Sequence, residues 1–191
     1  MEIIECKGEK FELRNKEDEV TLNELSAIAH ILENNDRDFT DKWLEVLSIL
    51  GSKDLVEKIN SKKFIEAIQL VQITNVQNKI ASEIEINGRT YSIDLDENGE
   101  IDLSAKDLVQ IEKMVRKGGV WGVKAFALVY KDVDLTSNEH YIDAHLKHKA
   151  LLFGENVMAN IGAPVIFQLS KIILEHIQKL VNANTESVPA T

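Results

Sequence analysis

The chain of 191 residues carries 32 acidic against 22 basic side chains and has a formal net charge of −10. This balance disfavours nucleic acid and anionic membranes as partners, because both are negatively charged and attract basic surfaces. Hydrophobic residues make up 44% of the chain and charged residues 28%, a composition typical of a globular protein rather than a disordered one.

The first elements predicted along the chain are a β-hairpin and a helix. The hairpin turns at Lys7-Gly8, between two short runs that contain apolar residues. The helix begins at Thr21, whose hydroxyl can cap the exposed amides, with Glu24 placed to complete a capping box. Cys6 is the only cysteine, so an intrachain disulfide is excluded and a small buried side chain is favoured.

Three further helices are predicted in the first half. They cover Thr40–Leu50, which Gly51 closes, a short segment around Asp54–Ile59, and a longer one from about Ser61 to Ile80. Apolar residues at helical spacing predict a buried stripe on the last of these, formed by Phe64, Ile65, Ile68, Val71 and Val76.

The second half begins with a clearer hairpin signal. Asn87-Gly88 lies between two short apolar runs, and this dipeptide suits the positive φ angles of a type I′ turn. A helix capped by Ser104 follows, with Asp107 near its positive end. After a break at Gly118-Gly119, the predicted elements are a segment over Val120–Tyr130, a helix from about Ser137 to Phe153, turns at Gly154 and Gly162, a long helix opened by Pro164, and a polar tail at 184–191.

The two halves share a spacing pattern that predicts a duplicated unit. Gly88 lies 80 residues after Gly8, and Ser104 lies 83 residues after Thr21. At the second offset the apolar stripe of the first helix is repeated, with Leu25, Ile28 and Leu32 falling on Leu108, Ile111 and Val115. The sequence therefore predicts an α+β fold, mostly helical, with two related units over residues 1–80 and 81–183. Each unit is a β-hairpin followed by several helices, and the two hairpins could pair or pack together.

The segment Asp94–Ala105 fits the calcium-binding loop of an EF-hand at several positions, among them Asp94, Asp96 and Asn98. The twelfth position must supply a bidentate carboxylate, but it is Ala105, and a hairpin stands in place of the incoming helix. An ordinary turn is therefore favoured over a weak cation site.

The only cluster of histidines comprises His140, His145 and His148, with Glu139 and Asp143 nearby. On a helix, His145 and His148 share a face and could hold a metal ion, with the two acids contributing from the adjacent turn. The interleaved lysines favour a solvated helix face. The alternative is a small metal-binding or hydrolytic protein that uses this cluster.

Nothing in the sequence predicts catalysis. His30 and His176 stand apart from any nucleophile elbow, and Ser26 and Ser170 fall within helical patterns. The glycine-rich segment 118–122 lacks the arrangements that cradle phosphate. The sequence thus predicts a non-enzymatic protein, with no catalytic, cofactor-binding or metal-binding residue assigned.

Several short segments carry a resemblance to a known class of proteins. They are Ile86–Ile93, Leu103-Ser104 with Leu108, and Ala125–Lys131, with a fainter echo in Phe11–Leu13 and Val20–Leu25. Their order resembles that of small proteins encoded among the tail and virion genes of tailed bacteriophages, in particular tail or baseplate assembly chaperones and accessory virion proteins.

The resemblance implies a protein that binds other tail or virion proteins, as an assembly chaperone or a structural adaptor. Its location would be the host cytoplasm during assembly and, for a component that stays, the virion. No segment has the features of a signal peptide or the roughly 20 apolar residues of a membrane span, which favours a cytosolic protein. Neither nucleic acid nor a membrane is expected as a partner. The chain could also associate with a second copy of itself.

Overall fold

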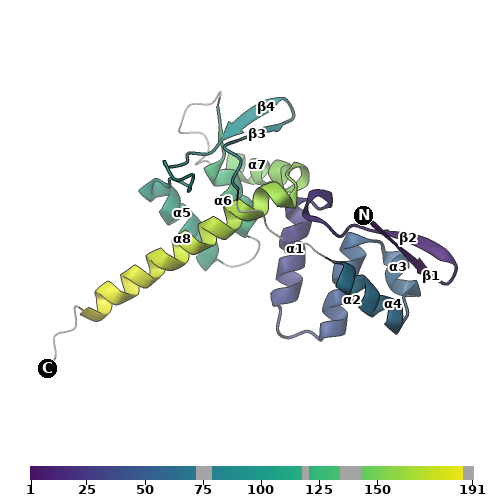
Figure 1. The fold of residues 1–191 in the computed structure, drawn as a ribbon. Coiled ribbons are helices and arrows are strands. Elements are labelled where there is room, and N and C mark those ends of the chain that lie inside the picture. Colours follow the sequence, from purple (N-terminus) through teal and green to yellow (C-terminus); the bar gives the residue numbers. More distant parts are fainter. Residues whose placement is uncertain (72–78, 118–120, 134–142, 187–191) are drawn as a thin grey trace.

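The computed structural model describes residues 1–71, 79–117, 121–133 and 143–186 (Figure 1). Over these residues the fold is α+β and mostly helical, with eight α-helices and two small antiparallel sheets, which confirms the predicted fold class. The first half contains β1 (Glu2–Cys6), β2 (Glu9–Leu13), a 3-10 helix η1 (Glu17–Glu19), α1 (Leu22–Glu33), α2 (Phe39–Leu50), α3 (Lys53–Lys58) and α4 (Ser61–Leu70). The second half contains β3 (Glu83–Ile86), β4 (Arg89–Ser92), α5 (Ala105–Arg116), α6 (Trp121–Val129), β5 (Lys131–Asp132), α7 (Asp143–Asn156) and α8 (Ala159–Glu186).

Both predicted hairpins form, each with a two-residue turn. Lys7 and Gly8 have φ angles of 51° and 83°, and Asn87 and Gly88 have φ angles of 53° and 75°. Two successive positive φ angles define the type I′ turn, whose twist matches that of the flanking strands. The hairpin predictions are therefore confirmed, including the one at Lys7-Gly8, where the sequence signal is weaker.

The two hairpins belong to separate sheets, so of the two alternatives, pairing or packing together, pairing does not occur. β1 and β2 form a two-stranded sheet, whereas β3 and β4 gain a third strand, β5, which pairs with β4 through Tyr91 opposite Asp132. Among the residues that the structure describes, the first sheet has no such third strand. The duplication of the two units stays a prediction.

Both predicted helix caps are present. At the start of α1 the Glu24 amide donates to the Thr21 hydroxyl over 3.3 Å, and the Thr21 amide donates to the Glu24 carboxylate over 2.9 Å, which is the complete capping box. At the start of α5 the Asp107 amide donates to the Ser104 hydroxyl over 3.1 Å. These contacts satisfy amides that have no partner inside their own helix.

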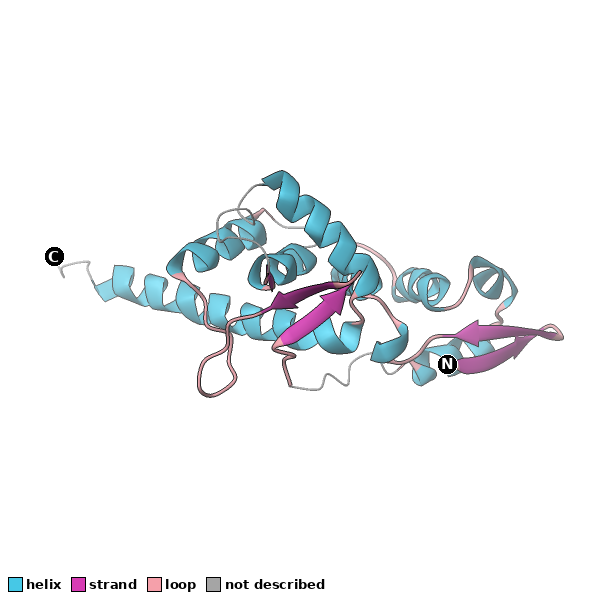
Figure 2. Cartoon of the chain, turned by 90° about the horizontal axis from the view of Figure 1, so that it is seen from above, coloured by secondary structure: helices cyan, strands magenta, loops and turns pink. Residues whose placement is uncertain are grey.

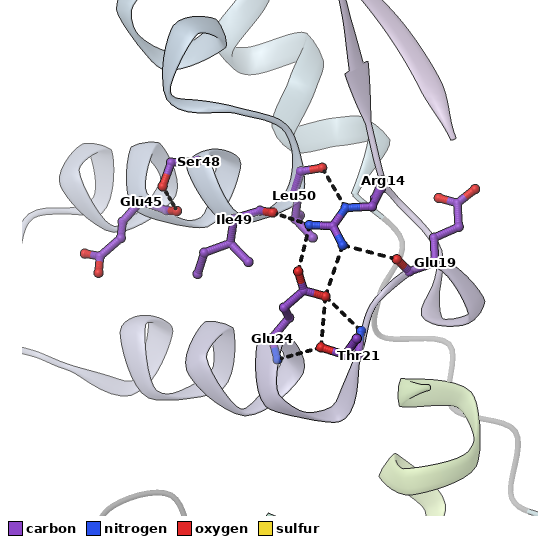
Figure 3. A network of polar contacts seen from close by, with 8 residues as sticks. All are labelled: Arg14, Glu19, Thr21, Glu24, Glu45, Ser48, Ile49 and Leu50. Atoms are coloured by element: carbon purple, nitrogen blue, oxygen red, sulfur yellow. Dashed lines mark hydrogen bonds and ion pairs between the residues drawn. The ribbon is translucent and has the colours of Figure 1, made fainter. Parts of the chain in front are cut away.

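Arg14 joins the first hairpin to two helices (Figure 3). Its guanidinium donates to the carbonyls of Ile49 and Leu50, at distances of 2.5 and 3.4 Å, and thereby satisfies oxygens at the end of α2. The same group pairs with the Glu24 carboxylate, with an Nη2–Oε1 distance of 2.8 Å. Because Glu24 also caps α1, this single arginine ties the hairpin to the start of α1 and the end of α2.

The predicted helix from Ser61 to Ile80 is too long. α4 ends at Leu70, and Val71 has an extended backbone with φ of −71° and ψ of 113°. The Asn15 side-chain amide donates to the Leu70 carbonyl over 3.1 Å, so a contact from the segment between β2 and η1 satisfies the helix end. Ile65, predicted in the buried stripe, is 55% exposed, and Val76 lies outside the described residues.

The predicted breaks at Gly154 and Gly162 and the predicted start at Pro164 are also wrong. Gly154 lies within α7 and Gly162 within α8, which begins at Ala159 and contains Pro164. A glycine within a helix lowers stability by about 1 kcal/mol relative to alanine. Here each of the two glycines leaves room for a side chain of α1 to approach closely. A Cβ at Gly154 would lie 2.1 Å from Asn23 Oδ1. Pro164 is the sixth residue of α8 and lacks the amide that would donate to the Asn160 carbonyl, yet the helix continues through it.

The start of α1 packs against the turn between α7 and α8 and so connects the two halves. The Leu22 amide donates to the Val157 carbonyl, and the Ala159 amide donates to the Val20 carbonyl, both over 2.8 Å. Gly162 allows Leu22 to approach α8, since a Cβ at that glycine would lie 2.5 Å from Leu22 Cδ1. This contact brings α1 next to the helices of the second half.

Two hydrophobic clusters form the core. One is made by β1, β2 and α1 to α4, and the other by the second half together with Leu22 from α1. Leu25 packs against both clusters. In Figure 1 the first-half elements lie to the right of α1, while α8 crosses the second half and runs beyond α5 and α6; the view in Figure 2 agrees.

Candidate functional site

Two of the three predicted histidines lie on one face of α7. His145 and His148 are three residues apart, and Lys149 and Leu152 continue the same face at helical spacing. His140 and Glu139 lie outside the described residues, and Asp143 is the first residue of α7. The described part of the predicted cluster is therefore a pair of histidines on the helix that faces the second hairpin.

A cavity of about 270 Å³ lies between this face of α7 and the sheet formed by β3, β4 and β5. The sheet contributes one exposed basic residue and one buried acidic residue, while α7 contributes two histidines and a lysine. The lining residues are Ile86, Asn87, Arg89, Tyr91, Asp132, His145, His148, Lys149 and Leu152. The ionisable side chains that line the cavity are thus mainly basic, in a chain whose net charge is −10.

Lys149 is the most unusual residue of this cavity. It is 3% exposed, and its Nζ has no hydrogen-bond acceptor among the described residues. The amino group lies 5.7 Å from the centre of the Tyr91 ring and 5.5 Å from that of Phe153. Burial lowers the pKa of Lys149 to about 8, an effect that Asp132 opposes and Lys131 reinforces. Cation–π attraction to two rings replaces part of the hydration that the ammonium group loses.

Arg89 and Asp132 complete the polar wall on the sheet side. Arg89 Nη1 lies 3.3 Å from Asp132 Oδ2; the Asp132 side chain is 4% exposed and that of Arg89 is 63% exposed. Burial raises the pKa of Tyr91, and the negative charge of Asp132 raises it further. The guanidinium therefore neutralises a buried carboxylate while most of the arginine remains open to solvent at the rim.

This arrangement bears on the metal hypothesis for the histidines. In the part of the chain that the structure describes, no group of three or more histidine, cysteine or acidic side chains is placed to hold a metal ion. Arg89 and Lys149 line the same cavity as His145 and His148, and their positive charges oppose a cation. A metal site using His140 and Glu139 stays a prediction, because both lie outside the described residues.

The segment Asp94–Ala105 has the contacts of an ordinary turn. The Asp96 carboxylate accepts the amides of Asn98 and Glu100 over 2.8 and 2.9 Å, and these bonds lower its pKa. Asp94 pairs with Lys131 over 2.6 Å. The carboxylates of Asp94 and Asp96 are thus engaged by the protein itself, and Ala105 begins α5.

A second hollow, of about 190 Å³, lies among α1, α6 and α8. His30 and Ser26 of α1 and Ser170 of α8 line this hollow together, although no sequence motif links them. The Ser170 hydroxyl donates to the Ile166 carbonyl over 2.8 Å, which is a bond within its own helix. Trp121 and Ile166 provide the apolar part of the wall. No local motif could reveal this hollow, because its walls come from three distant segments.

Beside this hollow, α8 exposes large apolar side chains. Phe167 is 67% exposed and Leu174 is 66% exposed. The two residues are seven apart, and Ser170 lies between them on the same side of the helix. We call the surface formed by Phe167, Ser170 and Leu174 the α8 face. Ser170 also lines the hollow, so the α8 face and the hollow adjoin.

No protein-family model matches the chain, and no match was found among curated proteins or among solved structures. Within the described ranges, none of the helices has the length and apolar character that a membrane crossing requires.

Proposed function

We propose that this chain is a non-enzymatic protein that binds another protein through the α8 face. Following the resemblance of its sequence, the proposed partner is a tail or virion protein of a tailed bacteriophage. The chain would act in tail or virion assembly, as a chaperone or a structural adaptor, in the host cytoplasm or in the virion. Neither nucleic acid nor a membrane is part of the proposal.

The observation that carries the proposal is the exposure of Phe167 and Leu174, two turns apart on one side of α8, at 67% and 66%. Single exposed apolar residues are common on protein surfaces and need no explanation. Two large ones on one helical face, next to a hollow lined by Trp121 and Ile166, form a surface suited to the apolar side chains of a partner.

The net charge of the chain favours a different protein, rather than a second copy of the chain, as the partner. Two copies that each carry a net charge of −10 repel one another. Lys171 is exposed on α8 between Phe167 and Leu174 in sequence, and it would attract an acidic group at the rim of a partner. The net charge of the chain and the exposed apolar side chains of α8 therefore favour a different protein with an apolar centre.

The test is to co-express the tagged chain with the genes that neighbour its own, to identify retained proteins by mass spectrometry, and to analyse purified particles in the same way. We expect a tail or virion protein to be retained. Recovery from lysate with absence from particles would indicate a chaperone, and presence in particles an adaptor. Affinity for the purified partner should then fall at least about tenfold in the Phe167→Ser/Leu174→Ser variant, because apolar anchors of this kind dominate binding.

A matched control removes an exposed apolar side chain elsewhere. Leu151 on α7 is 62% exposed, so Leu151→Ser removes one apolar side chain of similar exposure without touching the α8 face. Its affinity should equal that of the unmodified protein. Retention of no tail or virion protein, or equal loss of affinity in the control and the double variant, would refute the proposal. Self-association measured by sedimentation, abolished by the double variant, would instead assign the face to a second copy.

A further inference from the structure

The cavity between α7 and the second sheet is lined by a buried lysine, Lys149, whose amino group the protein does not fully compensate. Lys149 is 3% exposed and its Nζ has no acceptor among the described residues. A buried ammonium group without a hydrogen-bond acceptor is unfavourable, because neither water nor a protein oxygen replaces its hydration. The faces of the Tyr91 and Phe153 rings stabilise the charge, but neither residue accepts a hydrogen bond from Nζ.

The surroundings of Lys149 leave an excess of positive charge. Asp132 is the one acidic residue that lines the cavity among the described residues, and it is paired with Arg89 over 3.3 Å. His145 and His148 line the opposite side and can donate hydrogen bonds from their ring nitrogens. Donors from a strand and from a helix therefore converge on one small space.

We propose that this cavity binds a small oxyanion, the phosphate or carboxylate group of a ligand, with Lys149 and Arg89 as its main contacts. The anion would accept a hydrogen bond from Lys149 Nζ inside the cavity, and Arg89 would reach it from the rim. His145 and His148 would contact it from α7. This site is separate from the α8 face and does not depend on the function proposed for that face.

The dimensions of the cavity limit the ligand. A volume of about 270 Å³ lies just below the usual range of roughly 300 to 1,000 Å³ for small-molecule sites. Inorganic phosphate or a short carboxylate fits this space, whereas a nucleotide would extend far outside it. An apolar ligand would leave Lys149 without an acceptor, and a metal cation would be repelled by Lys149 and Arg89.

The experiment is a titration of the full chain with inorganic phosphate and, separately, with acetate, at pH 7 and at constant ionic strength set with sodium chloride. The ring signals of His145 and His148 are followed by NMR. We expect at least one of the two anions to shift these signals along a saturable curve. Saturation by phosphate alone identifies a phosphate site, saturation by acetate alone a carboxylate site, and saturation by both a general oxyanion site.

Lys149→Met removes the amino group and keeps a long side chain, and we expect it to weaken binding at least tenfold. Lys147→Met is the matched control, because Lys147 is exposed on the same helix and its loss changes the net charge equally. The control should bind as tightly as the unmodified chain. Arg89→Gln provides an independent variant at a mostly exposed position, and binding should weaken several-fold.

Three outcomes would overturn the proposal. The first is a linear response of the unmodified chain to both anions. The second is equal weakening by Lys147→Met and Lys149→Met, which would indicate surface charge alone. The third is unchanged affinity in folded Lys149→Met or, if that variant does not fold, in Arg89→Gln.

Discussion

At the scale of single residues, Arg14 and Lys149 show opposite ways of placing a positive charge in this fold. Arg14 donates to carbonyls at the end of α2 and pairs with Glu24 at the start of α1 (Figure 3). Lys149 is buried against aromatic rings without an acceptor among the described residues. Arg14 therefore supports the fold by satisfying backbone oxygens, whereas Lys149 lowers stability for as long as it stays charged and unpaired.

Lys149 should make stability depend on pH in a particular direction. Burial lowers its pKa from the usual 10.5 to about 8, so the folded chain releases this proton before the unfolded chain does. The destabilising effect is complete below pH 8 and is relieved as pH rises from about 8 to 10.5. The free energy of unfolding, relative to that of Lys149→Met, should therefore rise by up to roughly 3 kcal/mol across this window.

This prediction is checked by urea unfolding of both proteins between pH 7 and 10.5, in buffers free of phosphate and carboxylates. The comparison with Lys149→Met cancels other groups that titrate in the same range, such as Cys6, whose pKa is raised mainly by burial. A constant difference between the two proteins across the window would contradict the prediction. Below pH 8, Lys149→Met should be the more stable of the two.

At the scale of elements, α8 shows how packing overrides local preference. Glycine and proline disfavour helices, yet Gly162 and Pro164 both lie within α8. Gly162 faces Leu22, a completely buried residue of α1, and a Cβ at this glycine would come within 2.5 Å of Leu22 Cδ1. The close packing of α1 on α8 thus depends on the missing side chain.

Gly162→Ala should therefore destabilise the protein although alanine is the better helix former. Helix propensity would favour alanine by about 1 kcal/mol, but overpacking against Leu22 costs roughly 1 to 3 kcal/mol. We expect a net loss on the order of 1 kcal/mol, measured by chemical unfolding. In a Leu22→Ala background the clash is absent, so the same change should be neutral or stabilising. An equal loss in both backgrounds would show that Leu22 is not the cause.

At the scale of the whole molecule, the two hydrophobic clusters are joined through α1. Leu25 packs against both clusters, and Leu22 belongs to the cluster of the second half although it lies on a helix of the first. The backbone bonds between Leu22 and Val157 and between Ala159 and Val20 add to this junction. The predicted units 1–80 and 81–183 therefore share a buried contact within the described residues.

We expect the chain to unfold in one cooperative transition, with a calorimetric enthalpy equal to the van't Hoff enthalpy. Leu25→Ala should lower the midpoint of that single transition, because it removes packing from both clusters at once. Two separate transitions, only one of which responds to Leu25→Ala, would show that the units unfold independently. Differential scanning calorimetry of the full chain makes this distinction.

The features that the sequence predicts well are those with local causes. The turns at Lys7-Gly8 and Asn87-Gly88 follow from the need for positive φ angles, and the caps at Thr21 and Ser104 follow from side chains within reach of nearby amides. Each involves residues fewer than five positions apart, so no knowledge of the fold is required.

The errors and omissions concern contacts between distant segments. The end of α4 at Leu70 is satisfied by Asn15, and the start of α8 contacts Val20, which precedes α1, and Leu22, the first residue of α1. β5 is too short for a pattern of alternating residues to reveal, and it forms by pairing with β4. These features require the tertiary structure because their partners lie tens of residues away.

The candidate site divides in the same way. The sequence by itself determined that His145 and His148 share a helix face, since helical spacing alone places them there. Only the tertiary structure decided that this face meets Arg89 and Asp132 and that Lys149 is buried between them and two rings. Burial and the charge around a side chain depend on which elements pack together, and long-range packing is a property of the folded chain rather than of any short segment.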